Sequence, residues 1–190
     1  MKINILIVVA ILIIILVLFY LGSLEESSDN YIPINNNPGN VIGNTLDLSS
    51  KNLNSFNASS ISNKNQIKIL NLSNNNLKSL PSEIGEFVNL EELYLDNNIL
   101  EGAIVAEIRK MTHLKILSAK NNNLTGIPAE IGQLSNLYSI DFSNNSIDTM
   151  PNEIQNIKNN LKVFNLSGNR FSEEKMQEIK TFLPNTNIIF

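Results

Sequence analysis

One phrase returns along the chain from Ile67 to Gly168, with a period that alternates between about 23 and 24 residues. The copies share the skeleton LxxLxLxxNxL and read "IKILNLSNNNLKSLP", "LEELYLDNNILEGAI", "LKILSAKNNNLTGIP", "LYSIDFSNNSIDTMP" and "LKVFNLSGNRF". Self-similarity of this kind predicts a solenoid, in which each unit buries its apolar face only against its neighbours. A solenoid presents a long surface for binding and supplies no catalytic constellation of its own.

Each unit is predicted to contain one short strand, because its LxL core alternates apolar and polar residues with the two-residue period of a half-buried strand. The side chains predicted to point inward are Leu70 with Leu72, Leu93 with Leu95, Leu117 with Ala119, Ile140 with Phe142, and Phe164 with Leu166. A degenerate first copy, "TLDLSSKNLNSF", places Leu46, Leu48, Leu53 and Phe56 in the apolar positions.

The segments between the strands, such as "PSEIGEFVN" and "PAEIGQLSN", place two apolar residues about three positions apart. This spacing suits a short helical or 3₁₀ turn and is too short for a long helix. Pro81, Pro128 and Pro151 are predicted to start three of these turns, at a position where a missing N–H costs least.

Together these residues resemble the leucine-rich repeat family, from about Gly43 to the C-terminus, with five good copies and one degenerate copy of mixed LP and LxGxIP type. The resemblance implies an α/β fold: a right-handed solenoid of about six repeats, with a parallel sheet on its concave side and short helical or 3₁₀ segments on its convex side. The solenoid domain is therefore assigned to residues 43–190.

The tail "FSEEKMQEIKTFLPNTNIIF", residues 171–190, resembles the C-terminal cap of many bacterial members of the family. The resemblance implies an amphipathic helix followed by a short final strand. The residues expected on one face of that helix are Met176, Ile179, Phe182 and Leu183, and those expected to pair the last edge are Ile188, Ile189 and Phe190. Such a cap is needed because an open repeat end exposes core side chains.

One asparagine per unit follows the strand at a constant distance: Asn75, Asn98, Asn122, Asn145 and Asn169. We expect these side chains to form an internal ladder whose amides bond backbone groups where the chain turns, since leaving such buried groups unpaired would cost about 1–3 kcal/mol per site. Lys51 takes this place in the first unit, so the ladder is expected to end there. Asparagine is over-used elsewhere too, which we attribute to drift in an AT-rich genome.

The N-terminal residues 5–21, "ILIVVAILIIILVLFYL", are apolar without a break, close to the ~20 residues needed to cross a hydrocarbon core. Residues 1–22 are therefore predicted to be an uncleaved transmembrane signal-anchor, with a cleaved secretory signal and a buried helix as alternatives. Lys2 precedes the span, so the positive-inside rule sends the solenoid out of the cytoplasm. The polar residues 23–42 are predicted to be a flexible linker. Their alternative role is the N-terminal edge of the solenoid, and Val41 with Ile42 are expected to cover the first repeat.

Composition excludes several classes of function. The net charge of −4 gives no basic footprint for nucleic acid. The chain has no cysteine, which removes disulfides, thiolate metal sites and cysteine nucleophiles. The single histidine, His113, has no second histidine to complete a metal or catalytic site and is expected to be an exposed loop residue. No phosphate-binding loop, HExxH or GxSxG motif is present, so we expect neither an enzyme nor a cofactor.

Alternation also predicts which side chains face the concave surface, in columns spaced about 4.8 Å apart from unit to unit. From these columns, and from the outer position of Tyr138, the candidate partner-binding residues are Ile69, Glu92, Tyr94, Asp96, Ile116, Lys120, Tyr138, Asp141 and Val163. Tyr94 and Tyr138, with the aliphatic residues beside them, are the strongest candidates, because tyrosine is a frequent interface anchor. Strand faces also favour tyrosine without any partner.

The sequence thus predicts a monomeric, non-enzymatic module that binds a protein or peptide, held on a membrane by residues 5–21 with its solenoid outside the cytoplasm. Cleavage of the N-terminal segment would instead give a secreted protein. A structural or adhesive envelope protein is one alternative. An intracellular regulatory scaffold with the opposite topology is the other.

Overall fold

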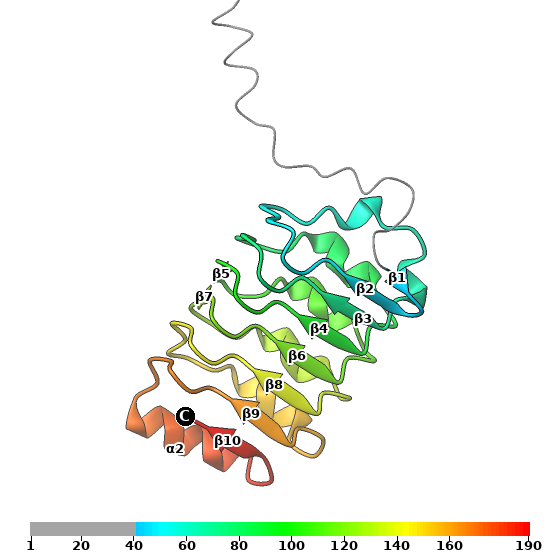
Figure 1. Cartoon of the computed structure of the whole chain (residues 1–190). Helices are drawn as coiled ribbons and strands as arrows, with labels where there is room; N and C mark the ends of the chain where they lie inside the picture. Colours follow the sequence, from blue (N-terminus) through cyan, green and yellow to red (C-terminus); the bar gives the residue numbers. More distant parts are fainter. Residues whose placement is uncertain (1–40) are drawn as a thin grey trace, which may run out of the picture. The chain divides into compact units, whose positions relative to one another are not determined.

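The computed structural model describes residues 41–190, in which stacked units place their strands side by side in one sheet (Figure 1). The eight-stranded sheet has the order β1-β2-β3-β4-β6-β8-β9-β10. Its strands are β1 (Val41–Ile42), β2 (Thr45–Asp47), β3 (Ile69–Asn71), β4 (Glu92–Tyr94), β6 (Ile116–Ser118), β8 (Ser139–Asp141), β9 (Val163–Asn165) and β10 (Asn187–Ile189). Every neighbouring pair is parallel except β1 and β2, which are antiparallel.

The sheet keeps one register across the repeats, so Leu70, Leu93, Leu117, Ile140 and Phe164 lie directly beside one another on successive strands. All the side chains predicted to point inward from these strands are at most 1% exposed, which confirms the prediction. Burial of each such leucine contributes roughly 1.5–3 kcal/mol, so the repeated apolar pair is what holds the units together.

Short 3₁₀ helices cover the other side of the core, as predicted, at the positions of the segments between strands (Figure 1). They are η1 (Ala58–Ser60), η2 (Lys64–Gln66), η3 (Ser82–Glu86), η4 (Ala106–Lys110), η5 (Ala129–Gln133) and η6 (Asn152–Ile157). The three predicted prolines occupy the position just before the helix, in extended backbone, and not its first residue. A proline there loses no helical hydrogen bond.

Two glycines let neighbouring 3₁₀ helices approach each other closely. A Cβ atom on Gly132 in η5 would lie 2.2 Å from the backbone oxygen of Glu153 in η6. A Cβ atom on Gly85 in η3 would lie 2.8 Å from the backbone oxygen of Glu107 in η4. Real Cβ contacts are essentially never shorter than 3.0 Å, so both positions require glycine for the observed spacing of the helices.

A second, two-stranded parallel sheet pairs β5 (Glu101–Gly102) with β7 (Asn123–Leu124). It joins the two units that read "LEGAI" and "LTGI", at the edge beyond the main strands. Gly102 has a positive φ of 70°, a conformation that glycine adopts without strain.

The C-terminal cap has the predicted parts, α2 (Glu173–Phe182) and β10 (Figure 1). Ser172 caps the helix, its hydroxyl accepting a hydrogen bond from the Lys175 N–H. Ile179 and Leu183 are buried, and Met176 and Phe182 pack against the core. The prediction for the last three residues needs one correction, because Phe190 lies beyond the strand and packs edge-on against Phe171 at 6.4 Å between ring centroids.

The predicted signal-anchor of residues 1–22 and most of the predicted linker lie outside the described residues, so both stay predictions. Within residues 41–190, no helix is long and apolar enough to cross a membrane. The end of the predicted linker lies at the solenoid's N-terminal edge, as expected for Val41 and Ile42. These two residues belong to the sheet, where they pair with Leu46 and Thr45.

Candidate functional site

The outward surface of the eight-stranded sheet, which we call the sheet face, carries its side chains in columns, as the strand register requires. The first column is Thr45, Ile69, Glu92, Ile116, Ser139 and Val163, and the second is Asp47, Asn71, Tyr94, Ser118, Asp141 and Asn165. An outer column, in which each N–H donates to the preceding carbonyl, contains Asn44, Lys68, Glu91, Lys115, Tyr138 and Lys162. The third column contains Ser73, Asp96, Lys120, Ser143 and Ser167.

The predicted internal asparagine ladder is present. In Asn122, Oδ1 accepts a hydrogen bond from the Leu100 N–H at 3.0 Å, and Nδ2 donates to the carbonyls of Leu95 and Ala119 at 3.0 and 3.1 Å. The same pattern recurs at Asn75, Asn98, Asn145 and Asn169. Within the described residues, no buried side-chain nitrogen or oxygen lacks a hydrogen-bond partner. These residues are structural and are closed to a ligand.

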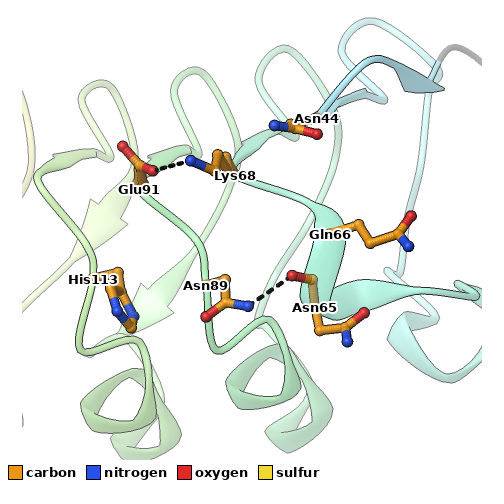
Figure 2. Close-up of a pocket in the computed structure, with 7 residues that line it drawn as sticks. All are labelled: Asn44, Asn65, Gln66, Lys68, Asn89, Glu91 and His113. Atoms are coloured by element: carbon orange, nitrogen blue, oxygen red, sulfur yellow. Dashed lines mark hydrogen bonds and ion pairs between the residues drawn. The ribbon is translucent and has the colours of Figure 1, made fainter.

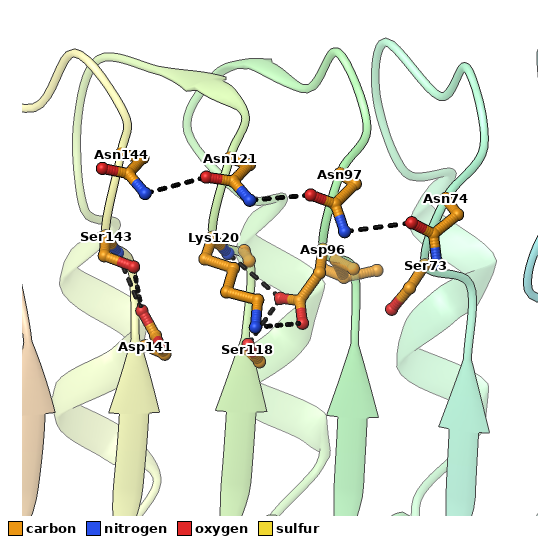
Figure 3. A network of polar contacts seen from close by, with 12 residues as sticks. Ser73, Asn74, Asp96, Asn97, Ser118, Lys120, Asn121, Asp141, Ser143 and Asn144 are labelled. Atoms are coloured by element: carbon orange, nitrogen blue, oxygen red, sulfur yellow. Dashed lines mark hydrogen bonds and ion pairs between the residues drawn. The ribbon is translucent and has the colours of Figure 1, made fainter. Parts of the chain in front are cut away.

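A second asparagine ladder runs along the surface and was missed by the sequence analysis (Figure 3). Asn97 donates to Asn74, Asn121 to Asn97, and Asn144 to Asn121, at 3.0, 2.7 and 2.9 Å between amide nitrogen and oxygen. All four residues have φ between 54° and 59°, the left-handed region that asparagine tolerates better than most residues. Gly168 takes the same place in the next unit, with φ of 71°. This backbone requirement explains these four asparagines without genome drift.

A third polar row lies where the chain leaves each 3₁₀ helix, and it explains His113 (Figure 2). The side chains of Asn89 and Asn136 donate to the carbonyls of Asn65 and Thr112 in the preceding unit, at 2.8 and 2.7 Å, and Asn160 bonds its preceding unit in the same way. His113 stands at the equivalent position, with Nδ1 at 3.2 Å from the Val88 carbonyl. The histidine is exposed, as predicted. It replaces an asparagine in this row.

Three charged candidates on the sheet face are used to fix the turns that follow the strands (Figure 3). The Asp141 carboxylate accepts hydrogen bonds from the backbone N–H and the hydroxyl of Ser143 at 2.9 and 2.6 Å. Asp96 reaches across to the next strand, where it accepts from the Ser118 hydroxyl and from the Lys120 N–H at 3.1 Å. The predicted Asp96–Lys120 ion pair is present at 3.8 Å, but it is the weaker part of this contact.

Tyr94 and Glu92 also engage each other. The Tyr94 hydroxyl donates a hydrogen bond to the Glu92 carboxylate at 2.7 Å. Burial, together with this bond to a carboxylate, raises the pKa of Tyr94 to about 12. Tyr94 lies on β4 and Tyr138 lies just before β8, with β6 between them.

Glu91 is held between two lysines of the outer column. Its carboxylate lies 2.8 Å from the Lys68 ammonium and 2.6 Å from the Lys115 ammonium, and Figure 2 shows the Lys68 contact. The hydrogen bond from Lys115, followed by that from Lys68, lowers the pKa of Glu91 from 4.5 to about 2. Because the folded chain favours the ionised form, this group adds to stability above pH 4.5. That contribution is lost as the pH falls through about 2.

We expect replacement of Lys115 by Met to raise the pKa of Glu91 more than replacement of Lys68 by Met, since Lys115 makes the larger contribution. Carbon-13 NMR of the carboxyl groups across pH 1.5 to 6 measures this directly. Lys78→Met removes the same charge from an exposed position outside the sheet face and is the matched control. A Glu91 pKa that stayed near 2 in the Lys115 variant would contradict the assignment.

The sheet face also presents apolar and aromatic side chains. Ile69, Ile116 and Val163 are half-buried in the first column, and Tyr138 is 55% exposed in the outer column. An open hollow surrounds Tyr138 and is lined by Lys115, Ile116, Asn136, Tyr138, Asn160 and Lys162. The partner-binding assignment of these residues stays a prediction.

The described residues do not gather a metal site, since no group of three or more His, Asp or Glu side chains in residues 41–190 could hold a metal ion. The sheet face presents apolar area and hydrogen-bonding groups. These are the means by which a binding scaffold recognises its ligand.

Comparison with known families agrees with this geometry. The Leucine Rich Repeat family model matches residues 66–87, 89–111, 113–134, 136–157 and 160–182. The chain belongs to the leucine-rich repeat family. No curated protein sequence matches the chain significantly.

Several solved structures share the fold. A leucine-rich repeat protein of Leptospira interrogans is 33% identical with a TM-score of 0.69, and the match covers 73% of this chain and 34% of that protein. The ectodomain of the receptor kinase GASSHO1/SCHENGEN3 from Arabidopsis thaliana, in complex with Casparian strip integrity factor 2, is 32% identical with a TM-score of 0.61 and coverages of 75% and 17%.

The plant peptide hormone receptor RGFR1, in complex with RGF2, is 28% identical with a TM-score of 0.59, and the match covers 76% of this chain and 24% of the receptor. The chain thus spans about a third or less of the length of these proteins. They share with it a fold that generally serves as a scaffold for binding proteins or peptides.

Proposed function

We propose that this chain is a non-enzymatic module that binds a protein or peptide on its sheet face. One observation carries the proposal: the strand register places Ile69, Ile116, Val163 and the exposed Tyr138 at one side of the sheet face. Apolar side chains beside an exposed tyrosine are what an interface core requires. The receptor structures with bound peptides support the same use of the fold.

The double variant Ile116→Ala, Tyr138→Ala should lose at least tenfold in the amount of partner that the full chain captures from a lysate of its own cells. Truncation removes the apolar area that anchors the interface and leaves the inward core unchanged. Quantitative mass spectrometry of the captured proteins measures the effect, and circular dichroism checks the fold.

A matched control is available off the sheet face. Val88 and Ile99 are 41% and 37% exposed, and neither belongs to a sheet-face column. The variant Val88→Ala, Ile99→Ala should capture the partner as the parent chain does. Equal capture by the parent chain and both variants would contradict a binding role for the sheet face.

Membrane display is the second part of the proposal. The apolar residues 5–21 support it, with Lys2 before them and acidic residues after them. In this arrangement the solenoid lies outside the cytoplasm and the chain stays anchored.

Protease added to intact cells should then digest the solenoid, and the full-length chain should remain with the membrane fraction after an alkaline wash. Digestion only after lysis would reverse the topology and favour an intracellular scaffold. A released chain lacking its first residues, identified by N-terminal sequencing, would show cleavage of the segment.

A further inference from the structure

Charged side chains are distributed unevenly over the sheet face, and their distribution points to the chemistry of its partner. We propose that the partner contributes an extended acidic peptide segment with an apolar side chain between its carboxylates, bound along a lysine–tyrosine rim formed by Lys115, Ile116, Tyr138 and Lys162. The proposal rests on the proposed binding function and deepens it by specifying the ligand.

The charges on the sheet face separate by strand end. The outer column, at the start of the strands, contains Lys68, Lys115 and Lys162 against the carboxylate of Glu91. The first column beside it adds one carboxylate, Glu92, which accepts the Tyr94 hydroxyl, so the two columns together keep one net positive charge. The second and third columns, at the other end, contain Asp47, Asp96 and Asp141 against Lys120. A ligand that crosses the strands along the outer column therefore passes over a positive potential, which favours carboxylates.

The lysines of the rim differ in how far they are neutralised. Glu91 lies between Lys68 and Lys115 and bonds both of them, so this trio keeps one net positive charge. The Lys162 ammonium contacts only a neutral group within the described residues, the Asn159 carbonyl at 3.0 Å. Lys115 and Lys162 thus flank Tyr138. Lys115 shares the Glu91 carboxylate with Lys68, and Lys162 pairs with no carboxylate among the described residues.

The spacing of these groups fits an extended chain. Equivalent residues on adjacent strands lie about 4.8 Å apart, so Lys115 and Lys162, two strands apart, are separated by about 10 Å at their backbones. An extended peptide rises about 3.3 Å per residue, so carboxylates two or three residues apart reach both ammonium groups. A side chain between them lies over Tyr138 and the half-buried Ile116, in the hollow that these residues line.

The probe for this proposal is the peptide acetyl-SEEFEES-amide, titrated into the isotope-labelled full chain in detergent micelles at 50 mM salt. Amide NMR shifts should concentrate at residues 115–116, 138–139 and 162–163. Lys162→Glu should weaken binding at least fivefold, and 500 mM salt should weaken it similarly. Lys78→Glu, which makes the same charge change at an exposed position outside the sheet face, should leave the affinity unchanged.

The proposal is overturned if the charge-reversed peptide acetyl-SKKFKKS-amide binds equally well, if Lys162→Glu leaves affinity unchanged, or if no shifts reach the rim at 5 mM peptide. It is also overturned if light scattering shows a second copy of the chain on the rim, displaced by Lys162→Glu. Failure of this proposal is separable from failure of the binding function. Partner capture that depends on Ile116 and Tyr138 but not on Lys162 would retain the function and remove the acidic ligand.

Discussion

Replacement of Asn122 by Ala is expected to lower the free energy of unfolding by about 2–4 kcal/mol, a large effect for a single polar substitution. The amide of Asn122 satisfies the Leu100 N–H and the carbonyls of Leu95 and Ala119, in a place where the side chain is 7% exposed. Alanine leaves the buried Leu100 N–H without a partner, and it removes one of the two amide donors from each carbonyl, because Asn98 still donates to Leu95 and Asn145 still donates to Ala119. Urea denaturation followed by circular dichroism measures the loss, and a melting temperature lower by about 10 °C should accompany it.

The neighbouring residue provides the control. Asn121 also donates and accepts a hydrogen bond, but it is exposed and has φ of 54°. Asn121→Gly should cost less than about 1 kcal/mol, because water replaces the lost partners and glycine adopts a positive φ without strain. Similar losses in the two variants would show that burial of the internal ladder is not what makes it important.

Replacement of Gly132 by Ala is expected to cost about 1–3 kcal/mol, although it adds only one methyl group. The new Cβ would meet the backbone oxygen of Glu153 at 2.2 Å, and backbone cannot rotate away as a flexible side chain can. The 3₁₀ helices η5 and η6 must therefore move apart, and the packing between two units is weakened.

Gly126→Ala is the matched control, since a Cβ there meets nothing within 4 Å and φ lies outside the left-handed region. This variant should be neutral, or more stable by up to about 1 kcal/mol through the smaller entropy of the unfolded chain. Chemical denaturation of both variants under one set of conditions gives the comparison. A Gly132 variant as stable as the Gly126 variant would mean that the helices are not in close contact.

Much of the fold could be predicted because the same residue pattern recurs in each repeat. The inward leucines, the strand register, the 3₁₀ turns, the internal ladder and the capping helix each follow from a residue type at a constant distance in the period. The left-handed positions could have been found by the same means. Asn74, Asn97, Asn121, Asn144 and Gly168 recur at one offset, and asparagine and glycine are the residues that tolerate positive φ.

The candidate site was less predictable, because its contacts depend on which neighbour each side chain selects. Asp141 bonds Ser143 in its own unit and Asn165 on the next strand, whereas, within the described residues, the Asp96 carboxylate bonds only the next unit, at Ser118 and Lys120. The binding of Glu91 by two lysines and the bond from Tyr94 to Glu92 are choices of the same kind. No period in the sequence encodes them, since each occurs once.

The internal amides reach backward: Asn122 completes the turn of the unit before it, and Asn145 then completes the turn that contains Leu124. The backbone hydrogen bonds of each unit are therefore completed only when the following unit is in place. On the ribosome, where the chain emerges from its N-terminus, we expect the ordering of each repeat to trail its synthesis by one repeat. The repeats of the nascent chain then assemble in one direction, from the N-terminal unit toward the C-terminal one.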